Sequence, residues 1–128
     1  MVVYFVTAIG TNIGKTHFCC NMLNYWHNKS YDVYGIKPII SGFDEKNLKD
    51  TDSYKLLQSI NVMADMASIQ AISPWRYKEP LSPDMAARHA NDIIEYQALL
   101  NFCNTYINNY NNYPNKLLLI EGVGGLMV

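Results

Sequence analysis

The tripeptide Gly14-Lys15-Thr16 is the part of the sequence whose residue types and spacing most clearly predict chemistry. It closes a phosphate-binding loop, in which backbone N–H groups hold phosphate oxygens. The Lys15 ammonium adds a full positive charge, and the Thr16 hydroxyl can ligate Mg²⁺. An apolar run over residues 2–7 predicts a buried strand before the loop, and a helix is expected over 15–28. This order of elements predicts a site for a nucleoside triphosphate.

The start of the loop departs from the strict phosphate-loop pattern. That pattern places a glycine where this chain has Ile9. Gly10 supplies backbone freedom beside it, and Ala8 and Thr11 are small. A Gly-Lys-Thr tripeptide also occurs by chance at a turn before a helix. The strand before it, the small residues within it and the helix after it favour nucleotide binding.

Three more charged residues are expected near this loop. Lys37, followed by Pro38, lies at the end of a second strand over residues 33–40, which the proline interrupts. Ligands of open α/β sheets bind at the carboxyl ends of the strands, which favours a role for Lys37 over a solvated surface position. Asp52 can cap a helix or hold Mg²⁺. Glu121 ends an apolar strand over 116–120, where a buried carboxylate is costly unless it is paired or metal-bound.

The elements around these residues predict an α/β fold, a doubly wound parallel sheet of the P-loop NTPase type, truncated after the strand that ends at Glu121. The first strand, helix and second strand form a βαβ unit with a right-handed crossover. Further helices are expected over 51–59, 85–91 and 93–109, with an irregular segment over 61–83 that contains three prolines. Residues 1–128 are expected to form the N-terminal part of one nucleotide-binding domain.

Helical spacing predicts which side chains pack in the core. In the helix over 15–28 the candidates are Phe18, Met22, Tyr25 and Trp26, and at least one of Cys19 and Cys20 is expected to be buried. In the helix over 93–109 the candidates are Leu99, Leu100, Phe102, Cys103, Tyr106 and Ile107. The Asn- and Tyr-rich residues 104–115 are interpreted as a solvated helix end.

The bulk composition argues against several classes of function. The net charge of −1 favours neither nucleic acid nor a membrane surface as a partner. No apolar run is long enough to span a membrane, and no signal-like region begins the chain. Three cysteines are too few and too badly spaced for a disulfide framework or a zinc site. A cytoplasmic location is therefore expected.

These motifs together resemble dethiobiotin synthetase, the ATPase of biotin biosynthesis. Residues 8–16 match the family's phosphate loop, although Ala8 replaces its first glycine and Asn12 replaces an acidic residue of some members. The family's other motifs match Lys37-Pro38-Ile39-Ile40-Ser41-Gly42, Thr51-Asp52, Pro80-Leu81-Ser82-Pro83 and Glu121-Gly122-Val123-Gly124-Gly125. Their order and spacing hold along the whole chain. Alanine at position 8 would be strained if the loop requires a positive φ there.

The resemblance implies a reaction and its residues. In the family 7,8-diaminopelargonate reacts with CO₂ to give a carbamate, which attacks the γ-phosphate of ATP. The second amine then closes a ureido ring on the carbamic-phosphoric anhydride. Lys15 and Lys37 are the implied catalytic residues, and Thr11, Lys37 and Ser41 the substrate-binding ones. Thr16, Asp52 and Glu121 are the implied Mg²⁺ ligands. The implied nucleotide-binding residues are Asn12, Ile13, Gly14, Lys15, Thr16, His17, Glu121 and Gly124.

Family members are homodimers that continue for several more strands, which carry the adenine-recognition residues and the partner residues that hold the substrate carboxylate. A chain ending at Val128 is expected to expose an apolar, unpaired strand edge, to associate or be marginally stable, and to be nearly inactive. Two alternatives stay open. Partitioning and metal-delivery ATPases share the fold, but they carry a lysine where this chain has Gly10. A catalytically impaired remnant that binds nucleotide would have the same motifs as an enzyme.

Overall fold

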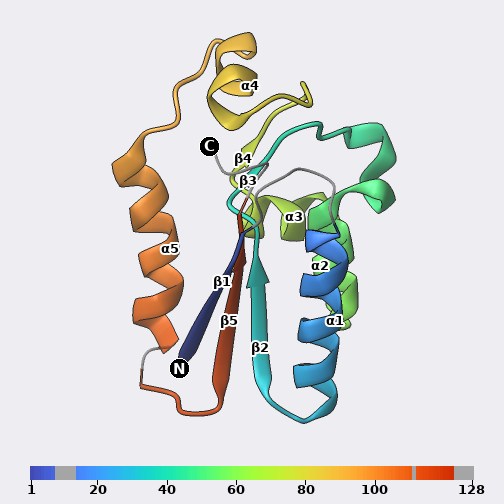
Figure 1. The fold of residues 1–128 in the computed structure, drawn as a ribbon, viewed down its shortest axis with the longest axis vertical. Helices are drawn as coiled ribbons and strands as arrows, with labels where there is room; N and C mark the ends of the chain where they lie inside the picture. The colour runs from blue at the N-terminus through green and yellow to red at the C-terminus, as the bar shows by residue number, and fades with distance from the viewer. Residues whose placement is uncertain (8–13, 111, 123–128) are drawn as a thin grey trace.

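A three-stranded parallel sheet forms the centre of the structure (Figure 1), a computed structural model that describes residues 1–7, 14–110 and 112–122. The strand order is β1 (Val2–Val6), β5 (Lys116–Glu121) and β2 (Asp32–Ile36). Leu117 of β5 lies opposite Val2 on one side and Val33 on the other. The predicted α/β fold with a parallel sheet is confirmed.

β5 occupies the middle of the sheet because its sequence is apolar on both faces. Its residues 117–120 are all buried, as parallel strands covered on both sides require. Its position brings Glu121 to the carboxyl edge of the sheet between β1 and β2. The ladder with β1 continues one residue further, where the N–H of Gly122 donates to the carbonyl of Val6 at 2.9 Å.

Helices cover the two faces of this sheet unequally. α1 (Lys15–Asn28) and α2 (Asp52–Ser59) lie on one side, and α5 (Tyr96–Tyr110) lies on the other (Figure 1). α1 connects β1 to β2 within the predicted bounds. Thr51 caps α2, because its hydroxyl accepts the N–H of Tyr54 at 3.3 Å, so the helix predicted over 51–59 is confirmed.

The segment over 61–83 is more regular than its prolines suggested. It contains α3 (Met66–Ile72) and the short strand β4 (Trp75–Arg76), so the prediction of an irregular segment is wrong. A capping box between Asp65 and Ser68 begins α3, a signal that was present in the sequence. β4 pairs with β3 (Ile39–Ile40), which β2 cannot include because Pro38 interrupts the strand as predicted. The 3₁₀ helix η1 (Glu45–Asp50) and α4 (Pro83–His89) complete the order.

The buried face of α1 differs from the predicted one. Cys19, Leu23 and Trp26 are buried, whereas Phe18 and Tyr25 are exposed and Met22 is half-buried. The reason lies on β2, where Gly35 leaves room for Leu23. A Cβ added at Gly35 would lie 2.7 Å from Leu23 Cδ1. This close approach fixes the rotation of α1, and the prediction of a buried Cys19 is confirmed.

Two further burial predictions are met only in part. None of the six candidates on α5 is fully buried; Leu99, Leu100, Phe102, Cys103, Tyr106 and Ile107 are each half-buried. Five of them nevertheless pack against buried core residues, as predicted: Leu99, Phe102, Cys103, Tyr106 and Ile107. Val2, Val3, Tyr4 and Phe5 of β1 are exposed, which contradicts the buried strand predicted from the apolar run and agrees with the exposed apolar strand edge that was also predicted. Both results share one cause, because β1 is an edge strand in the described part of the chain and α5 covers only part of the sheet. None of the described helices is long and apolar enough to cross a membrane.

Candidate nucleotide-binding site

The ammonium of Lys37 lies at the centre of a charged cluster at the carboxyl edge of the sheet. Its Nζ lies 2.5 Å from Oε2 of Glu121 and 3.2 Å from Oδ2 of Asp52. Lys37 follows β2, Glu121 ends β5, and Asp52 begins α2, so three separate elements supply the cluster. Lys37 is 3% exposed and Glu121 is 1% exposed. The predicted convergence of Lys37, Asp52 and Glu121 is therefore present.

The first turn of α1 joins the same cluster. The hydroxyl of Thr16 donates to Oε2 of Glu121 at 3.0 Å, across the end of the sheet. Gly14 precedes the helix with a φ of 84°, a left-handed conformation that glycine adopts without strain, and its carbonyl accepts the N–H of Phe18. The glycine thus turns the chain into the helix, and Thr16 then faces the carboxylate.

Lys15 lies in the electrostatic field of these groups. Partial burial and the neighbouring charge of Lys37 lower the pKa of Lys15, while the carboxylates of Glu121 and Asp52 act in the opposite direction. Two ammonium groups and two carboxylates therefore meet at one place. An arriving phosphate would relieve the repulsion between the two lysines, which is the electrostatic character expected of a phosphate site.

The oxygen atoms of the cluster fit a hard divalent cation. Among the described residues, Glu121 Oε1 is buried without a hydrogen-bond partner. The hydroxyl of Thr16 and the Asp52 carboxylate supply further oxygens near it. No group of three or more His, Cys, Asp or Glu side chains in the described ranges could hold a metal by itself. Mg²⁺ is commonly bound through one or two carboxylates, water and nucleotide phosphates.

Cys19 is a neighbour of Glu121 that the sequence did not predict for the site. Burial raises the pKa of the Cys19 thiol strongly, and the charge and hydrogen bonding of Glu121 raise this pKa further. Cys19 lies on α1 one turn after Thr16, and it is fully buried. The sequence placed Cys19 in the core correctly, but no local pattern indicates which charged residue influences its pKa.

The remaining predicted residues are only partly described. Thr11, Asn12, Ile13, Gly124 and Ala8 lie outside the described residues. His17 is exposed, with its Nε2 3.2 Å from Nδ2 of Asn21 on the next turn of α1.

Ser41 follows β3, in a turn that packs against the Pro-Leu-Ser-Pro motif. Gly42 has a φ of 70° there, and its N–H donates to the carbonyl of Glu79 at 3.1 Å. A Cβ added at Gly42 would lie 3.3 Å from Cβ of Pro80. Two motifs that are far apart in the sequence therefore meet beside the cluster.

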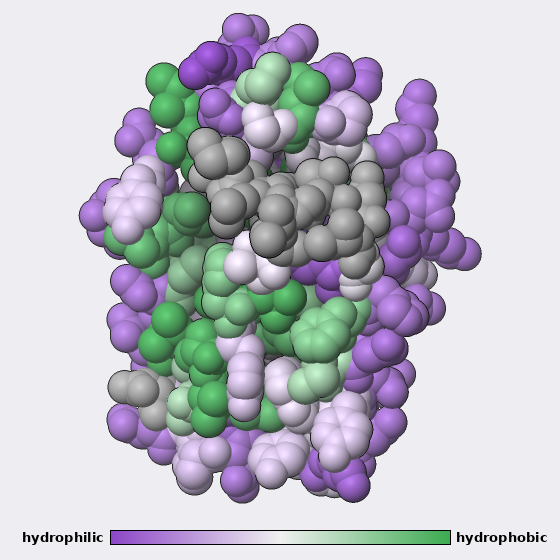
Figure 2. All heavy atoms as spheres, viewed as in Figure 1, coloured by the Kyte–Doolittle hydropathy of each residue, from purple (hydrophilic) through white to green (hydrophobic). Residues whose placement is uncertain are grey.

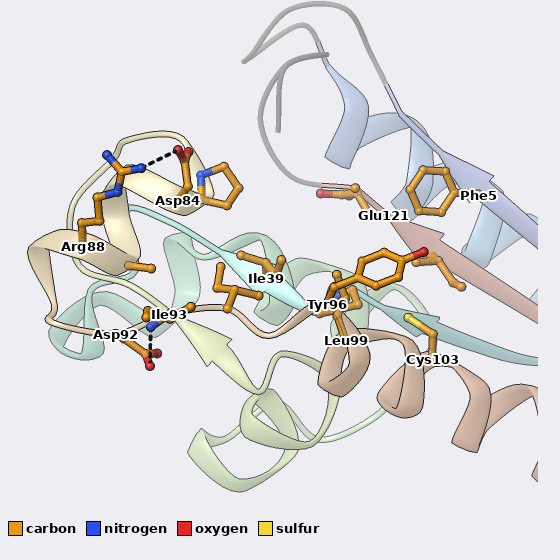
Figure 3. Close-up of a pocket in the computed structure, with 16 residues that line it drawn as sticks. Phe5, Ile39, Asp84, Arg88, Asp92, Ile93, Tyr96, Leu99, Cys103 and Glu121 are labelled. Atoms are coloured by element: carbon orange, nitrogen blue, oxygen red, sulfur yellow. Dashed lines mark hydrogen bonds and ion pairs between the residues drawn. The ribbon is translucent and has the colours of Figure 1, made fainter.

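An apolar cavity of about 700 Å³ adjoins the charged cluster at Glu121. Figure 3 shows Glu121 and Phe5 at one end of the cavity and Asp84 and Arg88 at the other. Its walls include Pro38, Ile39, Tyr96, Leu99, Cys103 and Ile120. The sequence did not predict this cavity. Of the apolar residues on α5 that were interpreted as core, Leu99 and Cys103 line the cavity, while Phe102, Tyr106 and Ile107 pack against the main core.

The fold and the charged cluster define a nucleotide-binding domain of the P-loop class. Comparison with protein families agrees, since the sequence model of the AAA domain family matches residues 3–128. The chain belongs to this family.

Among curated proteins, the chain is similar to ATP-dependent dethiobiotin synthetases named BioD. The protein of Acidiphilium cryptum is 35% identical over 126 residues, which are 98% of this chain and 55% of that protein. The Legionella pneumophila strain Paris protein is 34% identical over 98% of this chain and 54% of its own length. The Caulobacter vibrioides NA1000 protein is 33% identical over 96% of this chain and 53% of its own length. The resemblance stated from the motifs is confirmed, and the chain spans about half the length of these relatives.

Proposed function

We propose that this chain provides the nucleotide- and carbamate-binding part of an ATP-dependent dethiobiotin synthetase. The observation that carries the proposal is the buried ammonium of Lys37, which Glu121 and Asp52 hold beside the hydroxyl of Thr16. Burying the Lys37 ammonium costs solvation free energy. A role in the reaction explains this burial better than a contribution to stability does. The names of the similar proteins support the same reaction.

The proposed substrates are ATP, CO₂ and 7,8-diaminopelargonate. In the reaction two anions, a carbamate and a triphosphate, must approach one another. Lys15 would bind the phosphates from the start of α1, and Lys37 would stabilise charge on the carbamate and the γ-phosphate in the transition state. The apolar cavity beside Glu121 has walls suited to the hydrocarbon chain of the diamine.

Mg²⁺ fits the oxygens of Thr16, Asp52 and Glu121, and it would neutralise phosphoryl charge when bound with ATP. Thr16 and Glu121 already share a hydrogen bond, so little reorganisation would be needed to direct both oxygens at one cation. Thr11, Ser41, Asn12, Ile13, His17 and Gly124 are proposed as substrate and nucleotide contacts from the resemblance alone. The same resemblance leads us to propose a cytoplasmic homodimer.

The experiment that tests this function has two arms. Calorimetric titration with MgATP measures nucleotide binding, and bicarbonate-dependent phosphate release with 7,8-diaminopelargonate measures ring closure. If the chain turns over, Lys37→Gln should lower kcat more than it raises KM for ATP, because its contact is made mainly in the transition state. Lys55→Gln, at an exposed position on α2, is the matched control. Absence of ATP binding, or an unchanged kcat with a raised KM in Lys37→Gln, would contradict the assignment.

A further inference from the structure

The Lys37 ammonium contacts the oxygens that a divalent cation would use. Its Nζ lies 2.5 Å from Oε2 of Glu121 and 3.2 Å from Oδ2 of Asp52. The hydroxyl of Thr16 donates to the same Oε2 at 3.0 Å. The side chains proposed to hold Mg²⁺ therefore gather around a positive charge that belongs to the protein itself.

Lys37 satisfies only part of this set of oxygens. Glu121 Oε1 is buried, and among the residues that the structure describes it has no hydrogen-bond partner. Both oxygens of an ionised carboxylate accept hydrogen bonds, so an ammonium at Oε2 leaves the other oxygen unused. A hard cation takes several oxygen ligands at once and could use this remaining oxygen. The geometry therefore suits a metal ion better than it suits lysine.

The surroundings of the cluster are apolar. Ile36 precedes Lys37 and Ile120 precedes Glu121 in the chain, and both isoleucines are buried. Figure 2 shows hydrophobic side chains gathered over the sheet that leads to the cluster, between α5 on one side and α1 on the other. Water screens charges weakly in such surroundings. A divalent cation at Oε2 of Glu121 would contact the same atom as the ammonium, so repulsion would exclude one of the two.

Only the side chain of Lys37 is free to make way, because its backbone is fixed. The N–H of Lys37 donates to the carbonyl of Ile72 at 3.1 Å, and the carbonyl of Pro38 accepts the N–H of Trp75 at 3.1 Å. The flexible four-carbon stem of a lysine can move its ammonium without moving these bonds. The Thr16 hydroxyl can rotate its hydrogen away and offer a lone pair to a cation. Exchange of the ammonium for a metal therefore needs side-chain motion alone.

We propose that Lys37 is an internal substitute for the divalent cation. Its ammonium holds the Glu121 and Asp52 carboxylates when no metal is bound, and metal binding displaces it from both. This inference rests on the proposed metal site and adds to it a coupling between the metal and the position of the lysine. Lys37 then becomes available to the carbamate and the γ-phosphate only after the metal has bound.

Metal binding without nucleotide tests this exchange. Mn²⁺, a paramagnetic substitute for Mg²⁺, is titrated into residues 1–128, and the free ion is measured by electron paramagnetic resonance. Lys37→Met removes the competing charge and should bind Mn²⁺ at least about tenfold more tightly than the unaltered chain does. A lysine that only supported the fold would give the opposite result, because its loss would loosen the site.

Two variants control for charge. Lys37→Arg keeps the positive charge at the site and should show no gain in Mn²⁺ affinity. Lys55→Met removes the same charge from an exposed position on α2, and it should change the affinity by no more than about twofold. The double variant Lys37→Met/Glu121→Gln should lose the gain, because Glu121 is the ligand that the lysine and the metal share.

A measurement on the unaltered chain remains decisive if Lys37→Met fails to fold. Lys37 is 3% exposed and should react slowly with acetic anhydride when a chelator is present. Mn²⁺ should make this labelling at least about threefold faster, because the ammonium leaves its buried position. Peptide mass spectrometry measures the labelling, and Lys46, exposed in η1, is the internal reference.

Three results would overturn the proposal. The first is that a folded Lys37→Met binds Mn²⁺ no more tightly than Lys55→Met does. The second is that the double variant keeps the gain in affinity, since the metal would then bind away from Glu121. The third is equal labelling of Lys37 with Mn²⁺ and with chelator. None of these measurements uses ATP or the diamine, so failure of the exchange is distinguishable from failure of the proposed reaction.

Discussion

Lys37 is a charged side chain in a buried position, and its two carboxylate partners make that position tolerable. Glu121 is even less exposed, and its pairing with Lys37 joins residues 84 positions apart. Removing one member of such a pair leaves an uncompensated buried charge, whereas the intact pair adds little net stability. Each charged residue of the site therefore depends on the others. Single substitutions should show which residues contribute to nucleotide binding and which to the stability of the fold.

Lys15→Ala should weaken MgATP binding by about tenfold or more, because it removes a positive charge from the phosphate site. The melting temperature should change by no more than about 2 °C, since Lys15 is only partly buried at the first turn of α1. Calorimetric titration and thermal unfolding measure the two effects. Lys46→Ala, in the exposed part of η1, should leave both unchanged. Unaltered ATP affinity in Lys15→Ala would remove this lysine from the site.

Glu121→Ala should destabilise the fold by about 3 kcal/mol or more, because Lys37 would keep a buried charge with only Asp52 beside it. Urea unfolding followed by circular dichroism gives the free energy of unfolding. Asp84→Asn breaks a 3.9 Å ion pair with Arg88 at the surface and should have no measurable effect. Equal stability of the two variants would mean that the Lys37–Glu121 pair is not buried in solution.

The three cysteines should react slowly with iodoacetamide near pH 8, about the pKa of a free thiol. Burial and nearby carboxylates raise the pKa of Cys20 to about 11, and burial also raises the pKa values of Cys19 and Cys103. At a pH well below its raised pKa, Cys20 has less of the reactive thiolate form than a free thiol has. Its labelling rate should therefore increase as the pH approaches about 11. Peptide mass spectrometry with free cysteine as reference measures the rates. Labelling of Cys20 as fast as free cysteine would be inconsistent with this environment.

At the scale of elements, the contact between Leu23 and Gly35 sets how α1 lies on the sheet. Gly35→Ala should cost about 1–3 kcal/mol, because its Cβ would lie within 2.7 Å of a fully buried side chain. Leu23→Ala alone should cost about 2–5 kcal/mol through the cavity that it leaves. In the double variant the alanine methyl of residue 35 would fill part of that cavity. The two costs should therefore be less than additive in urea unfolding, and strict additivity would exclude this contact.

The end of α5 shows a second contact between elements. Tyr110 stacks on Tyr34 of β2 with ring centroids 4.7 Å apart. The ammonium of Lys116 lies over the rings of Tyr34, Tyr110 and Tyr113, and it also pairs with Asp32. The Asn- and Tyr-rich segment was interpreted as a solvated helix end. Tyr110 instead anchors the end of α5 to β2, so that interpretation is wrong for Tyr110, whereas Tyr113 is 55% exposed and agrees with it.

At the scale of the molecule, nucleotide should stabilise the fold. MgATP at about 100 times its Kd should add about 2.7 kcal/mol to the free energy of unfolding, since it binds only the folded chain. Thermal unfolding with and without MgATP measures this effect. A chelator should reduce the shift if Mg²⁺ contributes to binding through Thr16 and Glu121. A shift of the same size in Lys15→Ala would show that the nucleotide binds elsewhere.

The sequence by itself determined the features that local chemistry specifies. The helix over 15–28, its glycine start, the Thr51 cap and the break at Pro38 follow from backbone preferences within a few residues. The convergence of Lys37, Asp52 and Glu121 followed from a general property of parallel sheets, whose carboxyl ends share one edge. The placement of Thr11, Asn12, Ile13 and Gly124 stays a prediction.

Tertiary structure alone decided which surfaces became core. An apolar pattern shows that β1 can be buried, but burial requires neighbours on both faces and edges, and those are set by distant segments. The rotation of α1 depended on a glycine in β2, and the pairing of β3 with β4 joined residues far apart in the chain. Such contacts depend on how the whole sheet packs, and a short stretch of sequence does not specify that packing.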